Sequence, residues 1–107
     1  MHKLPLLITL AISFIISIPV YAFQVKVVST NKSIQGLGFT VNGKQNGGMG
    51  SEYHKAGMTK GNYSFGVRVN GKDIGCKAGG KKQVNLTGNT NVVLNLKGSH
   101  CTAEIGS

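Results

Sequence analysis

Apolar residues occupy every second position in seven short segments of this chain, and this periodicity limits the fold more than any other feature of the sequence. In an extended strand, successive side chains point to opposite faces, so the alternation indicates strands with one buried face. We expect an all-β domain, because no segment after residue 22 shows a helical period. The seven segments span residues 23–27, 37–41, 63–69, 74–76, 84–86, 92–96 and 101–105.

The dipeptide Asn70-Gly71 separates two of these segments and predicts a tight hairpin. Both central residues of a type I′ turn need positive φ, which Asn and Gly adopt most readily. Opposite charges then meet on one face and apolar side chains on the other, so the predicted register is consistent with itself. Pairing outward from the turn aligns Arg68 with Asp73, Val67 with Ile74, and Phe65 with Cys76.

Residues 87–91, with the sequence Thr-Gly-Asn-Thr-Asn, predict a second tight turn. Gly and Asn are among the residues that adopt turn conformations most readily. We therefore expect the strands at 84–86 and 92–96 to pair as a second hairpin.

A short repeat relates residues 38–44 to residues 66–72, since both end in Val-Asn-Gly-Lys. It reflects either a duplication or the chance recurrence of a strand followed by Asn-Gly. The segment after the first copy, residues 45–60, lacks alternation. We expect a long irregular loop there, which is either functional or simply mobile.

The first 22 residues have the layout of a secretory signal peptide. A cationic start at Lys3 precedes a long apolar run, and Val20-Tyr21-Ala22 places small residues at the −3 and −1 positions of a cleavage site. Cleavage after Ala22 makes residues 1–22 the signal peptide and residues 23–107 a single β-domain, exported to the periplasm or the medium. The alternative is an uncleaved membrane anchor, because the run nearly reaches the length of about 20 residues that a span needs.

Cys76 and Cys101 are the two cysteines of the chain, and both follow the leader. Cysteines of a small exported domain most often pair. Both lie on the apolar faces of their predicted strands, so we expect a disulfide near Phe65. The alternatives are free thiols or an intermolecular bridge.

The mature domain is strongly basic. Once Lys3 leaves with the leader, eleven of the twelve Lys and Arg residues remain against three acids, which gives a net charge of +8. Ten of the eleven are lysines, which suit diffuse attraction to polyanions better than the shaped contacts that Arg makes. We expect an anionic-ligand surface beside the Asn70-Gly71 turn and the glycine-rich turn after Cys76. Its candidate residues are Lys72, Lys77, Lys81 and Lys82.

The sequence shows no catalytic constellation. Residues 75–82 nearly match a phosphate-binding loop, but Lys82 replaces the required Ser or Thr, and we expect a strand to follow in place of a helix. Glu52 and His54 lie in a segment without predicted rigidity, and His54 and His100 are too few for a metal site. We therefore expect a protein that is not an enzyme and that holds no metal and no cofactor.

Together these patterns favour a small antiparallel β-sandwich of immunoglobulin-like or related type with about seven strands and one disulfide, with a small β-barrel as the alternative. The expected function is that of an exported binding module that contacts another protein. The alternative is an electrostatic binder of acidic glycan, lipopolysaccharide, nucleic acid or anionic lipid through the four lysines. Lysines gathered on one face would favour electrostatic binding, and scattered lysines with an apolar patch would favour protein contact.

Overall fold

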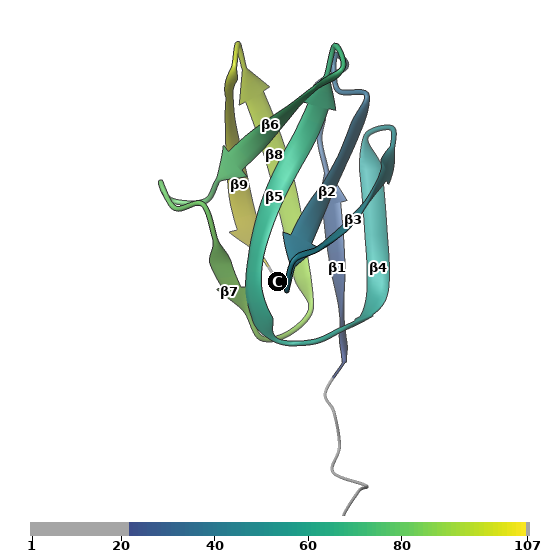
Figure 1. Cartoon of the computed structure of the whole chain (residues 1–107), viewed down its shortest axis with the longest axis vertical. Coiled ribbons are helices and arrows are strands. Elements are labelled where there is room, and N and C mark those ends of the chain that lie inside the picture. Colours follow the sequence, from purple (N-terminus) through teal and green to yellow (C-terminus); the bar gives the residue numbers. More distant parts are fainter. Residues whose placement is uncertain (1–21, 107) are drawn as a thin grey trace, which may run out of the picture.

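The computed structural model describes residues 22–106, and every regular element among them is a β-strand (Figure 1). The all-β class is therefore confirmed. In that part of the chain no helix is long and apolar enough to cross a membrane. The predicted signal peptide lies outside the described residues apart from Ala22, and the first strand begins at Phe23. The strands are β1 (Phe23–Val28), β2 (Gly36–Val41), β3 (Lys44–Met49), β4 (Glu52–Met58), β5 (Gly61–Val69), β6 (Lys72–Lys77), β7 (Val84–Leu86), β8 (Thr90–Lys97) and β9 (His100–Gly106).

Each of the seven predicted segments forms a strand, but residues 45–60 do not form the expected loop. They contribute most of β3 and all of β4, so the prediction of seven strands and a long irregular loop is wrong. The reason lies in polar residues that turn inward. Asn46 of β3 is 7% exposed, and its Oδ1 accepts a hydrogen bond at 2.8 Å from Nζ of the half-buried Lys55 of β4. Polar residues can be buried when they are hydrogen-bonded to each other. Because inward positions of β3 and β4 hold such residues, these strands show no alternation of apolar and polar residues.

The strands follow the order β3-β2-β5-β6-β9-β8-β1-β4 in one sheet, and β7 pairs separately with β5. Neighbours are antiparallel except β1 with β8 and β6 with β9. Gly50 and Ser51 join the two ends of the sheet, where Ser29 N–H donates to Ser51 O at 3.0 Å and Gly50 N–H donates to Gln35 O at 2.9 Å. The sheet is therefore nearly closed and barrel-like. The half made of β3, β2, β5 and β6 faces the viewer in Figure 1.

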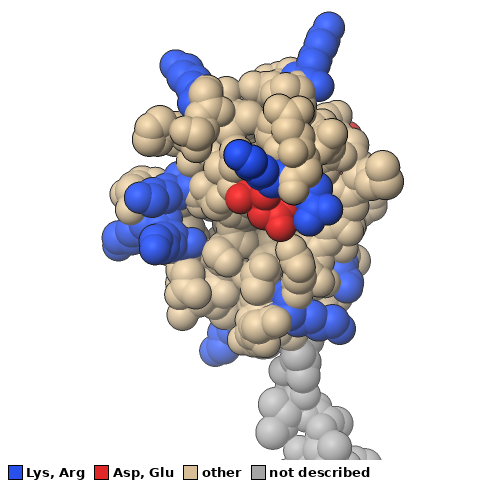
Figure 2. Space-filling view, turned by 45° about the horizontal axis from the view of Figure 1, so that its top comes forward, with Lys and Arg blue, Asp and Glu red and all other residues tan. Residues whose placement is uncertain are grey.

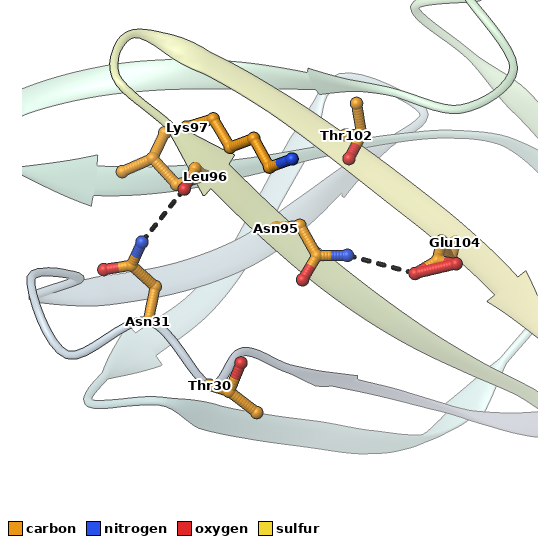
Figure 3. Close-up of a pocket in the computed structure, with 7 residues that line it drawn as sticks. All are labelled: Thr30, Asn31, Asn95, Leu96, Lys97, Thr102 and Glu104. Carbon is orange, nitrogen blue, oxygen red and sulfur yellow. Dashed lines mark hydrogen bonds between the residues drawn. The ribbon is translucent and has the colours of Figure 1, made fainter.

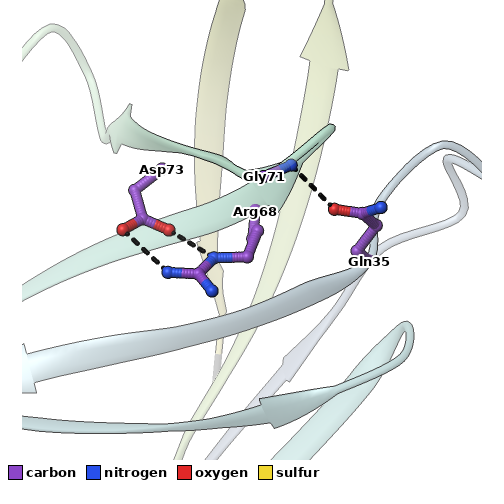
Figure 4. Close-up of polar contacts among 4 residues, drawn as sticks. All are labelled: Gln35, Arg68, Gly71 and Asp73. Atoms are coloured by element: carbon purple, nitrogen blue, oxygen red, sulfur yellow. Dashed lines mark hydrogen bonds and ion pairs between the residues drawn. The ribbon is translucent and has the colours of Figure 1, made fainter.

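The hairpin between β5 and β6 confirms the predicted turn and register. Asn70 and Gly71 have φ of 52° and 74°, and all the predicted residue pairs are present. The Arg68 guanidinium donates to both carboxylate oxygens of Asp73, at 2.9 and 3.2 Å, and this lowers the pKa of that carboxyl (Figure 4). The Gly71 N–H donates to Gln35 Oε1 at 3.0 Å, which ties the turn to the residue before β2.

Replacing Gly71 by Val is expected to lower the free energy of unfolding by more than about 1 kcal/mol. A β-branched residue resists the φ of 74° at this position, although a Cβ there would meet no atom within 4 Å. The denaturant midpoint of the purified protein measures the loss. Asn70→Gly is the control, because Gly adopts the same conformation without strain. An unchanged midpoint for the Val variant would argue against this turn.

The second predicted hairpin, at residues 87–91, does not form. β7 pairs with β5, whereas β8 pairs with β1 and β9 in the other half of the sheet. The connection therefore crosses between the halves, and it is held by Asn89 Oδ1, which accepts a hydrogen bond from Gln24 N–H at 2.8 Å. Thr90 Oγ1 also donates to Gly88 O at 2.7 Å. Turn-forming residues predict that the chain changes direction, but they do not determine with which strand the following segment pairs.

The core lies between the two halves of the sheet, and a disulfide closes one side of it. Cys76 of β6 and Cys101 of β9 are paired residues of adjacent strands, with Cα atoms 4.4 Å apart, and both are buried. The predicted disulfide is confirmed, and it is consistent with export to an oxidising compartment. Tyr63 is fully buried, and its hydroxyl donates to the Thr59 carbonyl oxygen at 2.6 Å. Burial raises the pKa of this hydroxyl.

Candidate functional site

A row of four glycines crosses the outer face of β3, β2, β5 and β6. Gly47 lies opposite Gly38, which also lies opposite Gly66. Gly66 in turn lies opposite Gly75. The four positions face outward, because their neighbours along the strands, such as Phe39, point into the core. This glycine row forms the floor of an open groove of about 1010 Å³.

Two rows of larger side chains flank the glycine row, and we call the floor and both walls the glycine groove. Met49 is 91% exposed, and its flexible, polarisable side chain suits contact with irregular surfaces. In the same wall, the ion pair of Arg68 and Asp73 supplies both signs of charge, Nε to Oδ1 2.9 Å (Figure 4). One wall consists of Met49, Arg68 and Asp73, and the other of Gln45, Thr40 and Ser64.

Close packing of neighbouring backbones explains why some positions of the glycine row require glycine, but not why all of them do. A Cβ at Gly38 would lie 2.1 Å from Asn46 O, and one at Gly47 would lie 2.8 Å from Leu37 O, so β2 and β3 require glycine there. A Cβ at Gly75 would meet no atom within 4 Å. Glycine inside a strand is destabilising by roughly 0.5–1 kcal/mol, and it can mark a place where a ligand or another backbone approaches closely. The space above Gly75 is therefore open to a bound molecule.

The four lysines predicted as an anionic-ligand surface lie at two separate places. Lys72 begins β6 and Lys77 ends it. Their Cα atoms are thus separated by about 16 Å at the usual rise per residue. Lys81 and Lys82 follow in a tight turn, in which Ala78 and Lys81 exchange backbone hydrogen bonds of 2.9 and 3.0 Å. The structure thus brings together Lys77, Lys81 and Lys82, which we call the lysine turn, and leaves Lys72 at the far end of the strand.

The other lysines are spread over both ends of the domain and over β1 and β4, which carry Lys26 and Lys55. Lys32 and Lys97 lie at the end that carries the β5–β6 turn, whereas Lys44 and Lys60 lie at the opposite end. Figure 2 shows basic side chains around the outline, most densely at its left margin, the side from which the lysine turn projects in Figure 1. Acidic side chains lie between basic ones near the middle of this view. Apart from the lysine turn, the positive charge is therefore scattered.

A second hollow, of about 610 Å³, lies on the outer face of β8 and β9 beside the β1–β2 connection (Figure 3). Asn31 Nδ2 donates to Leu96 O at 3.0 Å. Asn95 Nδ2 donates to Glu104 Oε1 at 3.0 Å. These polar groups already bind one another, so the hollow offers a ligand fewer free donors than its composition suggests, and the glycine groove is the better candidate site.

The residues that the sequence offered for catalysis or metal binding lie apart. Glu52 and His54 are exposed on β4, and Glu52 Oε2 lies 3.4 Å from Lys26 Nζ. His100 lies on β9, which does not pair with β4. Over residues 22–106, no three His, Cys, Asp or Glu side chains gather as metal ligands would. A strand, β7, follows the lysine turn, so no helix N-terminus is present there to bind a phosphate.

The sequence reasoning missed the glycine groove, although it found the repeat that builds it. Residues 38–44 and 66–72 lie 28 positions apart, and the same offset relates Gly47 to Gly75. The two copies pair antiparallel, with Gly38 opposite Gly66, so each hairpin contributes two of the four glycines. This offset is the signal that would have predicted the row. Comparison of the chain with known protein families, curated proteins and solved structures finds no match.

Proposed function

We propose that this protein is an exported, non-enzymatic binding module that contacts another protein through the glycine groove. The groove itself carries the proposal: its floor has no side chains, its volume is about 1010 Å³, and one wall holds an exposed Met and an ion pair. Apolar surface rimmed by polar residues is typical of protein-interaction sites. We infer that a small barrel presents this surface, since the sheet nearly closes through β3 and β4.

The chemistry of the groove suits a polypeptide partner. Above the glycine row, a partner chain can approach the backbone of the sheet closely. The hydroxyls of Thr40 and Ser64 on one wall can donate and accept hydrogen bonds, while Met49 on the other offers apolar contact. The scatter of the remaining lysines over both ends of the domain also favours protein contact over a purely electrostatic function.

The test of this proposal is a substitution that fills the groove at Gly75, the end of the glycine row where a side chain has space. In Gly75→Phe a large side chain occupies the floor where a Cβ meets no atom within 4 Å, so the fold should be retained. A photo-crosslinking amino acid in place of Met49, which is 91% exposed, reports contact with a partner in the exported fraction of the source cells. We expect a crosslinked product that Gly75→Phe removes.

Asn91→Phe is the matched control for this experiment. Asn91 is exposed on β8 and belongs to the half of the sheet opposite the groove, so its replacement should leave the crosslinked product unchanged. A product that survives Gly75→Phe, in a variant with the native melting temperature, would place the contact elsewhere.

The lysine turn favours a second function, the electrostatic binding of an anionic polymer or surface. Lys77, Lys81 and Lys82 are exposed in a turn that projects from the sheet (Figure 1). Within residues 22–106 the ion pairs are Lys26–Glu52 and Arg68–Asp73, so none of the three ammonium groups is neutralised by a carboxylate. Such a cluster attracts the phosphate, sulfate and carboxylate groups of acidic glycan, lipopolysaccharide, nucleic acid or anionic lipid.

Replacing the three residues of the lysine turn by Gln is expected to remove most binding to heparin. The melting temperature should stay nearly unchanged, because exposed charges contribute little to stability. Binding by the unmodified protein should weaken steeply with salt, measured by elution or by titration at several ionic strengths. Equal loss in the control would mean that overall charge drives the binding. The control is the triple Gln variant of equal net charge at Lys32, Lys44 and Lys60.

A further inference from the structure

The two ends of the glycine groove differ in charge. At the β6 end, Lys77 follows Gly75 at the next outward position of the strand and begins the lysine turn, which leaves the sheet there (Figure 1). At the β3 end none of the outward residues is charged; they are Gln45, Gly47 and Met49. A molecule that lies across the four strands therefore passes from an uncharged end to a basic one.

The basic end continues onto β9, which borders β6 on its other side. Lys77 lies opposite Thr102 of β9. His100 is the preceding outward residue of β9, and it lies opposite Lys97 of β8. Lys77 and Lys97 are exposed, and both belong to the outer face of the sheet. The surface next to Gly75 is therefore basic beyond the lysine turn itself.

The carboxylates near this end leave the positive charge in excess. Asp73 precedes Gly75 on the outer face, but the Arg68 guanidinium donates to both of its carboxylate oxygens, at 2.9 and 3.2 Å. Glu104 is the one acidic residue of β9. It stands against Lys97 and the three residues of the lysine turn, and the ion pairs within residues 22–106 include none of these four lysines. An acidic group therefore complements the β6 end of the groove.

The floor of the groove lacks the aromatic cover that a glycine has elsewhere in this sheet. On the inner face of β3, a Cβ at Gly48 would lie 3.2 Å from Cδ1 of Tyr53. At Gly75 no atom lies within 4 Å of such a Cβ, and at the other three positions of the glycine row the nearest atoms belong to the backbone. An aromatic ring can pack over a strand glycine and replace the contacts of the missing side chain.

The chain supplies no such ring from its own described residues. All their aromatic side chains are buried or half-buried and belong to the core or pack against it; they are Phe23, Phe39, Tyr53, Tyr63 and Phe65. The flat floor and the basic end are therefore both without a complement in the part of the chain that the structure describes.

We infer that the glycine groove binds an extended segment of its partner in which aromatic residues adjoin acidic ones. This inference rests on the function proposed above and names the chemistry of the partner. The aromatic rings lie on the glycine row, and the carboxylates reach Lys77 and the rest of the lysine turn. Four neighbouring strands span about 14 Å, which about four extended residues cross. One short segment can therefore contact both Met49 and Lys77.

The probe is the synthetic peptide Ser-Phe-Ser-Phe-Asp-Glu-Asp, titrated into the ¹⁵N-labelled exported protein at low salt. We expect amide shift changes at the glycine row and at Lys77, and nuclear Overhauser contacts between Phe ring protons and the Gly75 Hα atoms. Replacing both Phe residues of the peptide by Ala should weaken binding by about tenfold or more, because burial of an aromatic side chain favours association on that order. Gly75→Phe, which fills the floor, should remove binding.

A double-mutant cycle tests the contact between the carboxylates and the lysine turn. Replacing the three lysines of the turn by Gln should weaken binding about fivefold at low salt, and so should the peptide Ser-Phe-Ser-Phe-Asn-Gln-Asn. Combining the two changes should cost little more than either alone, because both remove the same interaction. The matched control is the triple Gln variant at Lys32, Lys44 and Lys60, which has the same net charge and should keep most of the affinity.

Three results would overturn this chemistry. Equal loss in both triple Gln variants would mean that overall charge attracts the peptide. Shift changes confined to residues 77–82 would mean that the rings do not lie on the glycine row. No shift change at millimolar peptide would rule out an aromatic and acidic segment. A Met49 crosslink that Gly75→Phe removes would in that case still support the groove as the contact surface, for a partner of different composition, so the two proposals fail separately.

Discussion

Replacing Cys76 and Cys101 together by Ala is expected to lower the free energy of unfolding by about 2–5 kcal/mol. The bond spans a sequence separation of 25 residues, and the loop-closure entropy for that length gives about 3.5 kcal/mol. A small domain has few kcal/mol of net stability, so this loss is a large part of the total. Apart from the bond, β6 and β9 are joined by two residue pairs. The side of the sheet where β6 meets β9 should therefore open first.

Denaturant unfolding measures this loss, and hydrogen exchange at Lys77 and Thr102, the pair next to the bond, locates it. Alkylation of the native protein without reductant should label neither cysteine. Reduction of the unmodified protein serves as the control, because it should lower the midpoint about as far as the double Ala variant does. An unchanged midpoint in both would show that the cross-link adds no stability to this sheet.

The positions of most strands were predictable because their alternation between core and solvent is nearly complete. Val25 and Val27 are fully buried, and Lys26 between them reaches Glu52 on the outer face. The β5–β6 register was also predictable, because two residues with positive φ fix hairpin pairing without any long-range information. Both features are determined by residues that are close in the sequence, and the structure contains them as predicted.

β3 and β4 were not predictable from hydrophobicity, because they bury a polar pair. An inward Asn is stable only with a partner, and the partner of Asn46, Lys55, lies nine residues away on a different strand. The crossing after β7 shows the same limit, since turn-forming residues do not specify whether β8 returns to β7 or joins β1. The glycine groove depends on such long-range pairing.

The lysine surface was predictable only where its members are close in sequence. Lys77, Lys81 and Lys82 share one turn whatever the fold. Lys72 precedes Lys77 by five positions, which is a short distance in a loop but the full length of β6 in the structure. Proximity along a chain becomes proximity in space in turns, whereas an extended strand separates the same residues.

Adding one methyl group in Gly38→Ala is expected to lower the free energy of unfolding by about 1–3 kcal/mol or more. The Cβ would lie 2.1 Å from Asn46 O and 2.6 Å from Gly47 Cα, closer than the 3.0 Å that real Cβ contacts keep. Both neighbours are backbone atoms, so no side-chain rotation relieves the overlap, and β2 must separate from β3. Because β3 carries Asn46, that shift would also strain the hydrogen bond to Lys55 that links β3 to β4.

Gly75→Ala is the control for the general effect of replacing a glycine in a strand, because it adds a methyl group without an overlap. A Cβ at Gly75 meets no atom within 4 Å, so the domain should be unchanged or more stable by up to about 1 kcal/mol, because the unfolded chain loses freedom. Urea midpoints of the two variants give the comparison, and equal losses in both would contradict the close packing of β2 on β3. A loss of stability in Gly38→Ala and none in Gly75→Ala would mean that strand packing requires glycine at Gly38 but not at Gly75. Glycine at Gly75 then keeps the groove open and lowers the stability of the fold.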